Sequence, residues 1–392
     1  MQPEMKRMSV YIHIPYCVRK CAYCDFLSFP DASSDSLAQT GKEYKKALLK
    51  ELELTVCKYP DRIIDTVFFG GGTPSHMSAF DIADIMDSLR TLYPFSDDAE
   101  VSLEANPGTV DEQKLRVYKD AGINRLSFGL QSSHDKELKL LGRIHVFDDF
   151  VKSLELAEKA GFENINADLM SALPGQNVKE WEDVLRTVAA FKILKHISAY
   201  SLILEEGTSF YERYKDGGLP SEETDREMYH ITREVLESYG YGRYEISNYA
   251  KPGYECRHNL VYWNRGDYIG VGLGASSCMD EVRFTNTSDI KKYIEITDLS
   301  GIRDSIEKLD ERSIRFEKVM LGFRLIEGID ESELLSGADE KTEKFFREQI
   351  EKNISLGLLV KENGRYKLSD EGLDLADHVI MDFYTDRADM IL

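Results

Sequence analysis

The sequence has few cysteines, little positive charge and no long apolar run, and each shortage excludes a class of protein. Six cysteines in 392 residues are too few for a disulfide-stabilised secreted fold and favour a reducing compartment. Lys and Arg total 49 against 70 Asp and Glu, a formal charge of −21, which argues against a general nucleic-acid binder. No apolar stretch reaches the length of a membrane span, and residues 1–8 are too short and polar for a secretory signal. We therefore expect a soluble cytoplasmic protein with no transmembrane segment and no nucleic-acid partner.

Half of the cysteines are clustered with CxxxCxxC spacing just after the apolar run at residues 11–15: Cys17, Cys21 and Cys24. Thiolates hold iron–sulfur clusters, and four of them would fill every iron of a [4Fe–4S] cluster. The next cysteine, Cys57, lies far along the chain in a helical pattern, so three thiolates would leave one iron open to another ligand. A structural zinc site is the alternative. It needs four ligands, and His13 could be the fourth only by folding back across Pro15.

Apolar strand-like runs alternate with amphipathic helical patterns as far as residue 202. The predicted strands are residues 9–14, 66–69, 100–105, 125–130, 164–170 and 196–202. The predicted helices between them are residues 42–57, 80–92, 110–121, 146–160 and 178–191. Six βα repeats imply an α/β fold with a parallel sheet. Because a closed TIM barrel has eight repeats, the sequence predicts a partial (β/α)6 TIM-type barrel.

Three domains are predicted. Residues 1–220 form the barrel with the cysteine cluster, and residues 221–305 extend it with a helix at 222–239 and a strand at 243–249. Residues 306–392 form a C-terminal α+β module. Helical patterns there, at 314–325, 330–335 and 340–356, precede a hairpin at 357–368 with an Asn-Gly turn, which predicts a winged-helix-like module. Its acidic character argues against DNA binding, so we interpret it as a lid or docking domain.

Polar residues stand at the predicted C-terminal ends of the strands, the edge that carries function in such barrels. They are the cysteine loop, the triple glycine before Thr73, Glu104, Gln131, Asp168 and the segment at residues 200–202. The glycines allow backbone groups to approach a ligand closely, although a tight βα turn is the alternative, and the Lys-Ser/Thr of a phosphate-binding loop is missing. Groups of this kind can hold a zwitterion, a ribose and a base. This edge is the predicted binding site.

A second candidate lies at residues 256–263, which read Cys-Arg-His-Asn-Leu-Val-Tyr-Trp. They place the imidazole of His258 near the aromatic rings of Tyr262 and Trp263. An imidazole beside flat apolar surface suits a planar macrocycle or an axial bond to its metal. A buried, hydrogen-bonded histidine in an aromatic core explains the same composition, and both interpretations stay open at this point.

The motifs together resemble those of radical S-adenosylmethionine (SAM) proteins, in the branch of the oxygen-independent coproporphyrinogen III oxidases. The resemblance rests on Tyr-Ile-His-Ile-Pro-Tyr-Cys, Cys-Ala-Tyr-Cys-Asp-Phe, Gly-Gly-Gly-Thr-Pro, Glu-Ala-Asn-Pro-Gly, Leu-Gly-Arg-Ile-His and Leu-Pro-Gly-Gln, and it covers nearly the whole chain. It implies that Cys17, Cys21 and Cys24 bind a [4Fe–4S] cluster. It further implies that the amino and carboxylate groups of SAM chelate the open iron, and that reduction releases a 5′-deoxyadenosyl radical.

The same resemblance implies which residues contact SAM, and it assigns no catalytic residue. Positions that match contacts of this first SAM are Tyr11, Gly71 and Glu104. Positions that match a second SAM site found in the oxidase are Tyr23, Gly72, Thr73, Gln131, Arg143 and Asp168. Glycine backbone groups can pair with polar groups of SAM without steric cost. Carboxylates can accept hydrogen bonds from amine or ribose groups, and a guanidinium can pair with a carboxylate.

Two departures from the oxidase pattern point to another branch of the family. Phe26 stands where the oxidase has a further cysteine, two residues after the third ligand. The HNxxYW pattern of His258, Asn259, Tyr262 and Trp263 resembles the signature of the family's heme chaperones, which bind heme and hand it to acceptor proteins. The resemblance therefore implies a heme carrier whose partners are heme and a heme-acceptor protein, and transient docking to a membrane-bound acceptor is compatible with it.

Two other functions are the alternatives. One is an enzyme, either the oxidative decarboxylase of coproporphyrinogen III or another radical SAM enzyme that acts on heme. The other is a radical SAM enzyme that modifies RNA, which the charge of −21 and the lack of a basic extension weaken.

Overall fold

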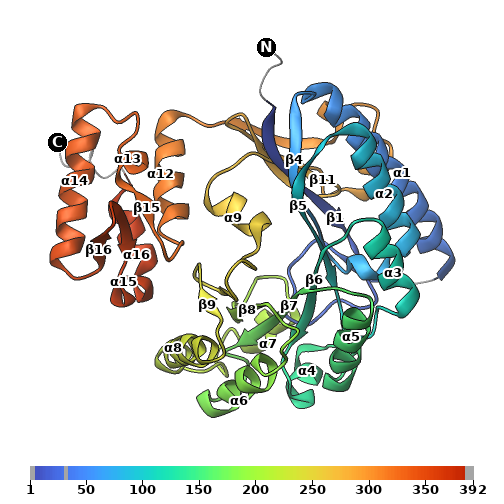
Figure 1. Cartoon of the computed structure of the whole chain (residues 1–392), viewed down its shortest axis with the longest axis horizontal. Coiled ribbons are helices and arrows are strands. Elements are labelled where there is room, and N and C mark those ends of the chain that lie inside the picture. Colours follow the sequence, from blue (N-terminus) through green and yellow to red (C-terminus); the bar gives the residue numbers. More distant parts are fainter. Residues whose placement is uncertain (1–4, 31–33, 385–392) are drawn as a thin grey trace.

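The computed structural model describes residues 5–30 and 34–384, and a sheet of twelve strands organises it (Figure 1). The centre of the sheet is six parallel strands in the order of the chain: β1 (Lys6–Ile14), β4 (Arg62–Gly71), β5 (Phe95–Ala105), β6 (Arg125–Gln131), β7 (Asn164–Ser171) and β8 (His196–Ser201). Each includes or nearly includes a predicted strand. The predicted partial parallel barrel is confirmed. Its strands lie side by side in chain order, and over the described residues the sheet does not close into a full barrel.

Helices separate the parallel strands along the chain, and most of them cover the outer face of the curved sheet (Figure 1). They are α1 (Ser34–Lys58), α2 (Ala79–Leu92), α3 (Glu112–Asp120), α4 (Asp135–Leu141), α5 (Phe147–Lys159) and α6 (Val178–Ala189), followed after β8 by α7 (Ser209–Tyr214) and α8 (Glu222–Ser238). In β6 six of seven residues are buried, with apolar side chains such as Leu126 and Phe128 in the core and polar ones such as Arg125 and Ser127 on the inner face. The main hydrophobic core fills the space between the sheet and the other helices, whereas α4 and α7 belong to a separate cluster in which Leu141 and Phe210 pack near Ala22 and Tyr23 of the cysteine loop.

The segment after α8 adds strands to both edges of the parallel sheet. At one edge β8 pairs with β10 (Asn248–Ala250) and β10 with β9 (Gly242–Arg243), both antiparallel. At the other edge β1 pairs in parallel with β11 (Tyr268–Val271), which begins the antiparallel series β12 (Ser276–Met279), β13 (Val282–Asn286) and β14 (Arg303–Lys308). The single strand predicted at 243–249 is wrong. The chain turns there because the Glu245 carboxylate accepts a hydrogen bond from Ser247 N at 3.1 Å.

Two short helices, α10 (Ile290–Ile294) and α11 (Leu299–Ile302), connect β13 to β14, while β2 (Tyr16–Cys17) and β3 (Phe29–Pro30) form a small pair at the two ends of the cysteine loop. The single helical turn η1 (Pro74–His76) follows the triple glycine. Helix α9 (Arg257–Trp263) lies on the inner side of the curved sheet, opposite α1–α3 (Figure 1).

The C-terminal module has a hydrophobic core of its own. Its elements are α12 (Glu311–Gly322), β15 (Ile329–Asp330), α13 (Glu331–Leu334), α14 (Glu340–Ser355), β16 (Leu359–Glu362), β17 (Arg365–Leu368), α15 (Asp370–Asp374) and α16 (Ala376–Asp382). The predicted hairpin is confirmed as β16 and β17, and Asn363 and Gly364 at its turn have φ of 51° and 80°, as a type I′ turn requires. The predicted helix at 330–335 is only the single turn α13, because Asp330 is already paired in β15.

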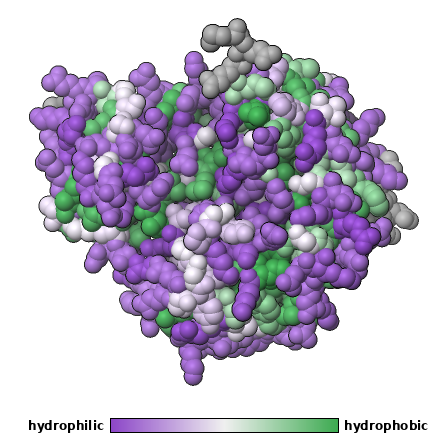
Figure 2. All heavy atoms as spheres, viewed as in Figure 1, coloured by the Kyte–Doolittle hydropathy of each residue, from purple (hydrophilic) through white to green (hydrophobic). Residues whose placement is uncertain are grey.

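The outer surface matches the composition. Figure 2 shows a largely hydrophilic face, as expected for a chain with a net charge of −21. Among residues 5–30 and 34–384, no helix has the length and apolar character needed to cross a membrane.

Candidate functional site

The cysteine loop lies at the C-terminal end of β1 and is held there by the C-terminal end of helix α4. Ala22 N donates to the carbonyl of Leu141 at 3.0 Å, and Arg19 donates to the carbonyl of Gly142 at 2.6 Å. All three cysteines of the motif are half-buried, whereas Cys57 is exposed and the two other cysteines are buried. The loop therefore presents three thiols at the edge of the sheet where the sequence predicts the binding site.

The zinc alternative lacks its fourth ligand. His13 is committed elsewhere, because Nε2 pairs with the carbonyl of Leu27 at 2.8 Å and Nδ1 with the Tyr11 hydroxyl at 3.1 Å. Within the described ranges, no three His, Cys, Asp or Glu side chains come together around one point as a single metal ion requires. Three thiols and several irons remain the better match to this loop.

The triple glycine is joined to the cysteine loop through the backbone. Gly72 N donates to Ile14 O and Thr73 N to Tyr16 O, both at 2.8 Å. Gly71 has φ of +108°, and a Cβ there would lie 2.5 Å from the His13 ring. Only glycine fits this position, so the close approach of backbone to ligand that the sequence predicts is available at the strand end.

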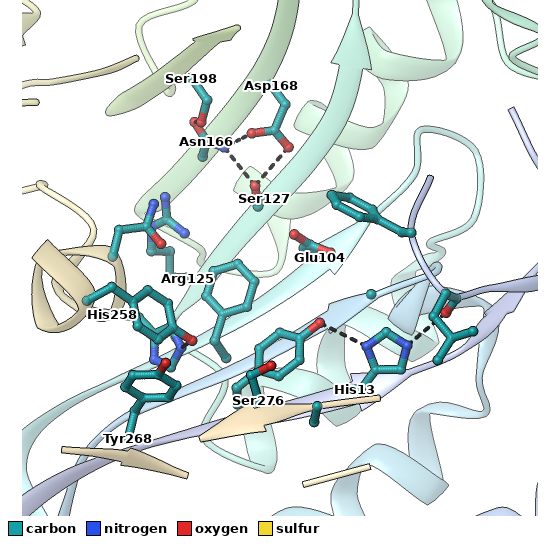
Figure 3. Close-up of a pocket in the computed structure, with 18 of the residues that line it drawn as sticks. His13, Glu104, Arg125, Ser127, Asn166, Asp168, Ser198, His258, Tyr268 and Ser276 are labelled. Atoms are coloured by element: carbon teal, nitrogen blue, oxygen red, sulfur yellow. Dashed lines mark hydrogen bonds between the residues drawn. The ribbon is translucent and has the colours of Figure 1, made fainter. Parts of the chain in front are cut away.

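A cavity of about 530 Å³ opens inside the curved sheet next to the glycines. Its walls include Tyr11, Glu104 and Asp168. Glu104 can be reached from the cavity, yet burial and then the neighbouring Asp168 charge raise its pKa to about 8. Burial also raises the pKa of Asp168, opposed by hydrogen bonds that include Ser127 at 3.2 Å and Asn166 at 2.8 Å (Figure 3). Two carboxyl groups in a poorly hydrated cavity favour a ligand that brings hydrogen-bond donors or positive charge.

A smaller cavity of about 120 Å³ adjoins the first and contains the cysteines. The predicted site residues that line it are Cys17, Cys21, Cys24, Tyr23, Gly71, Gly72, Thr73, Glu104, Gln131, Arg143 and Asp168. Gly71, Glu104 and Asp168 line both cavities. The structure thus brings together every residue predicted for the cluster and for SAM, with Tyr11 on the larger cavity only. The donor set fits both groups: three thiols for the cluster, and carboxylates with exposed glycine backbone for the polar end of SAM.

Helix α9 forms a wall of the larger cavity, with His258, Asn259 and Tyr262 lining it. Its start is fixed by the buried Glu100 of β5, whose carboxylate accepts hydrogen bonds from the backbone N–H groups of Arg257 and His258 at 3.2 and 3.1 Å. Figure 3 places His258 and Tyr268 at one end of the cavity and Glu104 and Asp168 toward the other. The second candidate segment and the predicted SAM residues therefore face the same space.

His258 is buried and uses both ring nitrogens. Nδ1 lies 2.7 Å from Thr66 Oγ1, and Nε2 lies 2.8 Å from the Tyr262 hydroxyl. Because Thr66 donates its own proton to Ser9 at 2.7 Å, Nδ1 of His258 carries the proton and Nε2 accepts from Tyr262. Burial lowers the pKa of His258 to about 3, so the ring is neutral. In this state His258 is a hydrogen-bonded core residue, and Nε2 can bind a metal only after the Tyr262 hydrogen bond breaks.

Trp263 points elsewhere. Its indole Nε1 is buried without a hydrogen-bond partner among the described residues, and the guanidinium of Arg324 lies 5.9 Å from its ring centroid. Arg324 follows α12, the first helix of the C-terminal module. The residues of the HNxxYW pattern therefore face two ways. His258, Asn259 and Tyr262 line the cavity, whereas Trp263 does not line it and contacts the C-terminal module.

Three residues of this region were not predicted from the sequence. Glu100 anchors α9, Arg125 lines the larger cavity as a buried side chain at the start of β6, and Asn106 joins Thr73 to Arg143. A charged residue at the start of a predicted strand was an available signal for Arg125. Asn106 stands inside the Glu-Ala-Asn-Pro-Gly motif, but only the fold shows its partners.

The chain is similar to known protein families and to curated proteins over most of its length. Residues 11–188 match the Radical SAM superfamily, and residues 309–375 match the HemN C-terminal domain. The chain is 37% identical over 376 residues to the heme chaperone HemW of Bacillus subtilis (strain 168), covering 95% of this chain and 97% of that protein. It is 36% identical over 378 residues to the heme chaperone HemW of Escherichia coli (strain K12), covering 94% and 96%.

One solved structure shares the whole architecture. Coproporphyrinogen III oxidase (HemN) from Escherichia coli, described as a radical SAM enzyme, aligns with a TM-score of 0.84 over 98% of this chain and 91% of that chain. The two sequences are 23% identical, so this likeness establishes a common fold.

Proposed function

The chain belongs to the heme chaperone HemW family of the radical SAM superfamily, and from that membership we propose that it binds heme and transfers it to an acceptor protein. The observation that carries the proposal is α9, because His258, Asn259 and Tyr262 of its HNxxYW pattern line the 530 Å³ cavity. The resemblance assigns that pattern to heme chaperones, and the cavity gives it a place to meet a ligand.

The proposal includes a [4Fe–4S] cluster held by Cys17, Cys21 and Cys24, with SAM on its open iron. Gly71 offers backbone groups that no side chain obstructs, and Glu104 offers a carboxylate to the amino group of SAM. When bound, the reduced cluster would supply the one electron that cleaves SAM. The cysteine loop, the glycines and Glu104 would hold and orient both groups at one strand edge.

Heme would lie against α9, on the side of the cavity away from the cysteines. The wall there combines aromatic rings with polar tips: Tyr262 and Tyr268 meet edge to face with ring centroids 4.7 Å apart, and Phe68 stacks on His258 at 5.1 Å. Aromatic surface of this kind can bury one face of a macrocycle. For His258 to reach the iron, it would exchange the hydrogen bond from Tyr262 for the metal.

Phe26 supports a carrier over the decarboxylase. It stands where the oxidase pattern has a cysteine, lines both cavities and is 61% exposed. An apolar ring at the shared mouth of the two cavities offers no thiol for that chemistry. The acceptor would be a heme-binding protein, including one docked at a membrane.

The test is a heme titration of the anaerobically reconstituted chain, with coproporphyrinogen III and SAM supplied in a parallel assay. The proposal expects a Soret-absorbing complex at micromolar heme and no release of carbon dioxide. A chain that forms no heme complex, or that decarboxylates coproporphyrinogen III, would refute the chaperone and support the enzyme.

A pair of conservative variants tests the role of His258. Tyr262→Phe keeps the ring but removes the hydroxyl that donates to Nε2; if His258 binds iron, losing this competing bond of about 1 kcal/mol tightens heme binding about fivefold. Tyr268→Phe is the matched control, because it removes a hydroxyl from the same wall without touching His258. Equal heme affinities for the two variants would make His258 a structural residue.

A further inference from the structure

Two of the cysteine thiols, Cys17 and Cys21, lie within hydrogen-bonding distance of polar side chains from other segments. Thr73 Oγ1 lies 3.5 Å from Cys17 Sγ as a donor, and Arg143 Nη1 lies 3.5 Å from Cys21 Sγ as a donor. Both distances lie within the range of hydrogen bonds to sulfur. Thr73 is buried and Arg143 is half-buried, so water competes weakly for these donors.

Asn106 connects the two donors. Its Nδ2 donates to Thr73 Oγ1 at 2.9 Å, and its Oδ1 accepts from Arg143 Nη2. The second N–H of the same Nη2 goes to the carbonyl of Gly129. One amide thus fixes the direction of both side chains, and the Thr73 hydroxyl, which accepts from Asn106, is left to donate its proton toward sulfur.

We propose that Arg143, Thr73 and Asn106 form a hydrogen-bonded layer behind the cluster ligands that raises the reduction potential of the cluster. The proposal rests on the proposed [4Fe–4S] cluster and adds residues that tune it. A cluster that accepts one electron becomes more negative, so donors and a positive charge at its thiolates favour the reduced state. One electron enters the cluster, and no protein bond forms or breaks.

The same contacts argue against the second SAM site that the family resemblance implies for Arg143 and Thr73. Nη2 of Arg143 has given both hydrogens to Asn106 and Gly129, so an end-on fork of the two Nη groups toward a carboxylate is not available. Thr73 likewise donates to Cys17. In this chain the two positions serve the cluster, and we expect one SAM per chain.

The experiment is a redox titration of the full reconstituted chain with dithionite, followed by electron paramagnetic resonance, alongside iron and sulfide analysis. Arg143→Met removes the donor and charge, Thr73→Val removes one hydroxyl at nearly constant shape, and Asn106→Leu removes the bridge. Arg116→Met is the control, because Arg116 is exposed on α3 and pairs only with Glu112 among the described residues.

Arg143→Met should lower the midpoint potential by the equivalent of about a tenfold change in the reduction equilibrium, which is ~59 mV for a one-electron couple. Thr73→Val and Asn106→Leu should shift it in the same direction by less. Calorimetry with SAM should give a stoichiometry near one. If Arg143→Met does not fold, Thr73→Val decides the sign.

Two results would overturn the inference: variants that keep their cluster with the midpoint potential of Arg116→Met, or two SAM bound per chain. The proposed function fails separately. If the wild-type chain assembles no cluster, the proposed [4Fe–4S] site is wrong. If it assembles a cluster whose potential the variants do not change, only the role of Arg143, Thr73 and Asn106 is refuted.

Discussion

Glu104 gives the sharpest prediction about SAM, because its carboxyl group must ionise to meet a cation. Burial and the nearby Asp168 charge raise its pKa to about 8. At pH 7 roughly nine tenths of the chains therefore carry a neutral Glu104, and ionising it costs ~1.4 kcal/mol. The sulfonium charge of SAM, and an amino group that donates a hydrogen bond, favour the ionised form, so binding should release a proton from Glu104.

The expected pH dependence follows from that cost. SAM affinity should rise about tenfold per pH unit until pH 8 and then level off, since the cost of ionisation disappears above the pKa. Calorimetry at several pH values, in two buffers with different enthalpies of ionisation, measures both the affinity and the number of protons released.

Glu104→Gln is the control that isolates this group. It keeps the shape and cannot titrate, so the remaining pH dependence belongs to SAM and to other residues. The variant should bind SAM about five- to hundred-fold more weakly at pH 8, the effect of an ionic hydrogen bond worth ~1–3 kcal/mol. If the wild type and Glu104→Gln release the same number of protons and share one pH profile, Glu104 does not contact the cation.

Three further predictions concern the cysteines, α9 and the glycine loop. Cys21→Ala should lose its iron and sulfide while Cys57→Ala keeps them, and iron analysis showing the reverse would contradict the cluster assignment. His258→Ala should lose about 2–5 kcal/mol of unfolding free energy, because a buried ring and two hydrogen bonds disappear; an unchanged denaturation midpoint would show that this network contributes nothing. Gly71→Ala should weaken SAM binding and stability, since its Cβ would meet an imidazole at 2.5 Å; Gly161→Ala, with φ of +81° and open space around the new Cβ, is the control and should keep full SAM affinity.

Much of the barrel could be predicted because its signals are local. Strands such as β4 contain a short apolar run, and the residues of the strand ends, Glu104 and Asp168 among them, follow directly from where each strand stops. A parallel sheet brings those ends to one edge. The cysteines, the glycines and the carboxylates therefore meet as the sequence predicts.

Strand β11 could not be predicted, for a physical reason. Gly270 within it and Gly272 directly after it weaken the strand pattern, yet the fold needs both glycines: a Cβ at Gly270 would lie 2.3 Å from Ser276 O, and one at Gly272 would lie 2.7 Å from the Tyr44 hydroxyl. The close approach of β12 and α1 that makes glycine necessary also removes the side chains by which a strand is recognised.

The surroundings of His258 were equally hidden. Its partner Thr66 lies 192 positions away in the sequence, and Glu100, which anchors α9, is about as distant. Composition left the ligand and the core interpretation open, and only the fold shows both ring nitrogens in use. Asn106 is similar, since one of its partners, Thr73, follows β4 and the other, Arg143, follows helix α4.

The central claim is that this chain carries heme and passes it on, and transfer tests it most directly. Chain loaded with one equivalent of heme is mixed with an apoprotein that binds heme in a pocket of its own, and the Soret band of the acceptor is followed over time. The account predicts that heme moves to the acceptor while coproporphyrinogen III, supplied with SAM and reductant to the same preparation, stays unconverted. A preparation that retains no heme, or that turns over coproporphyrinogen III, would contradict it.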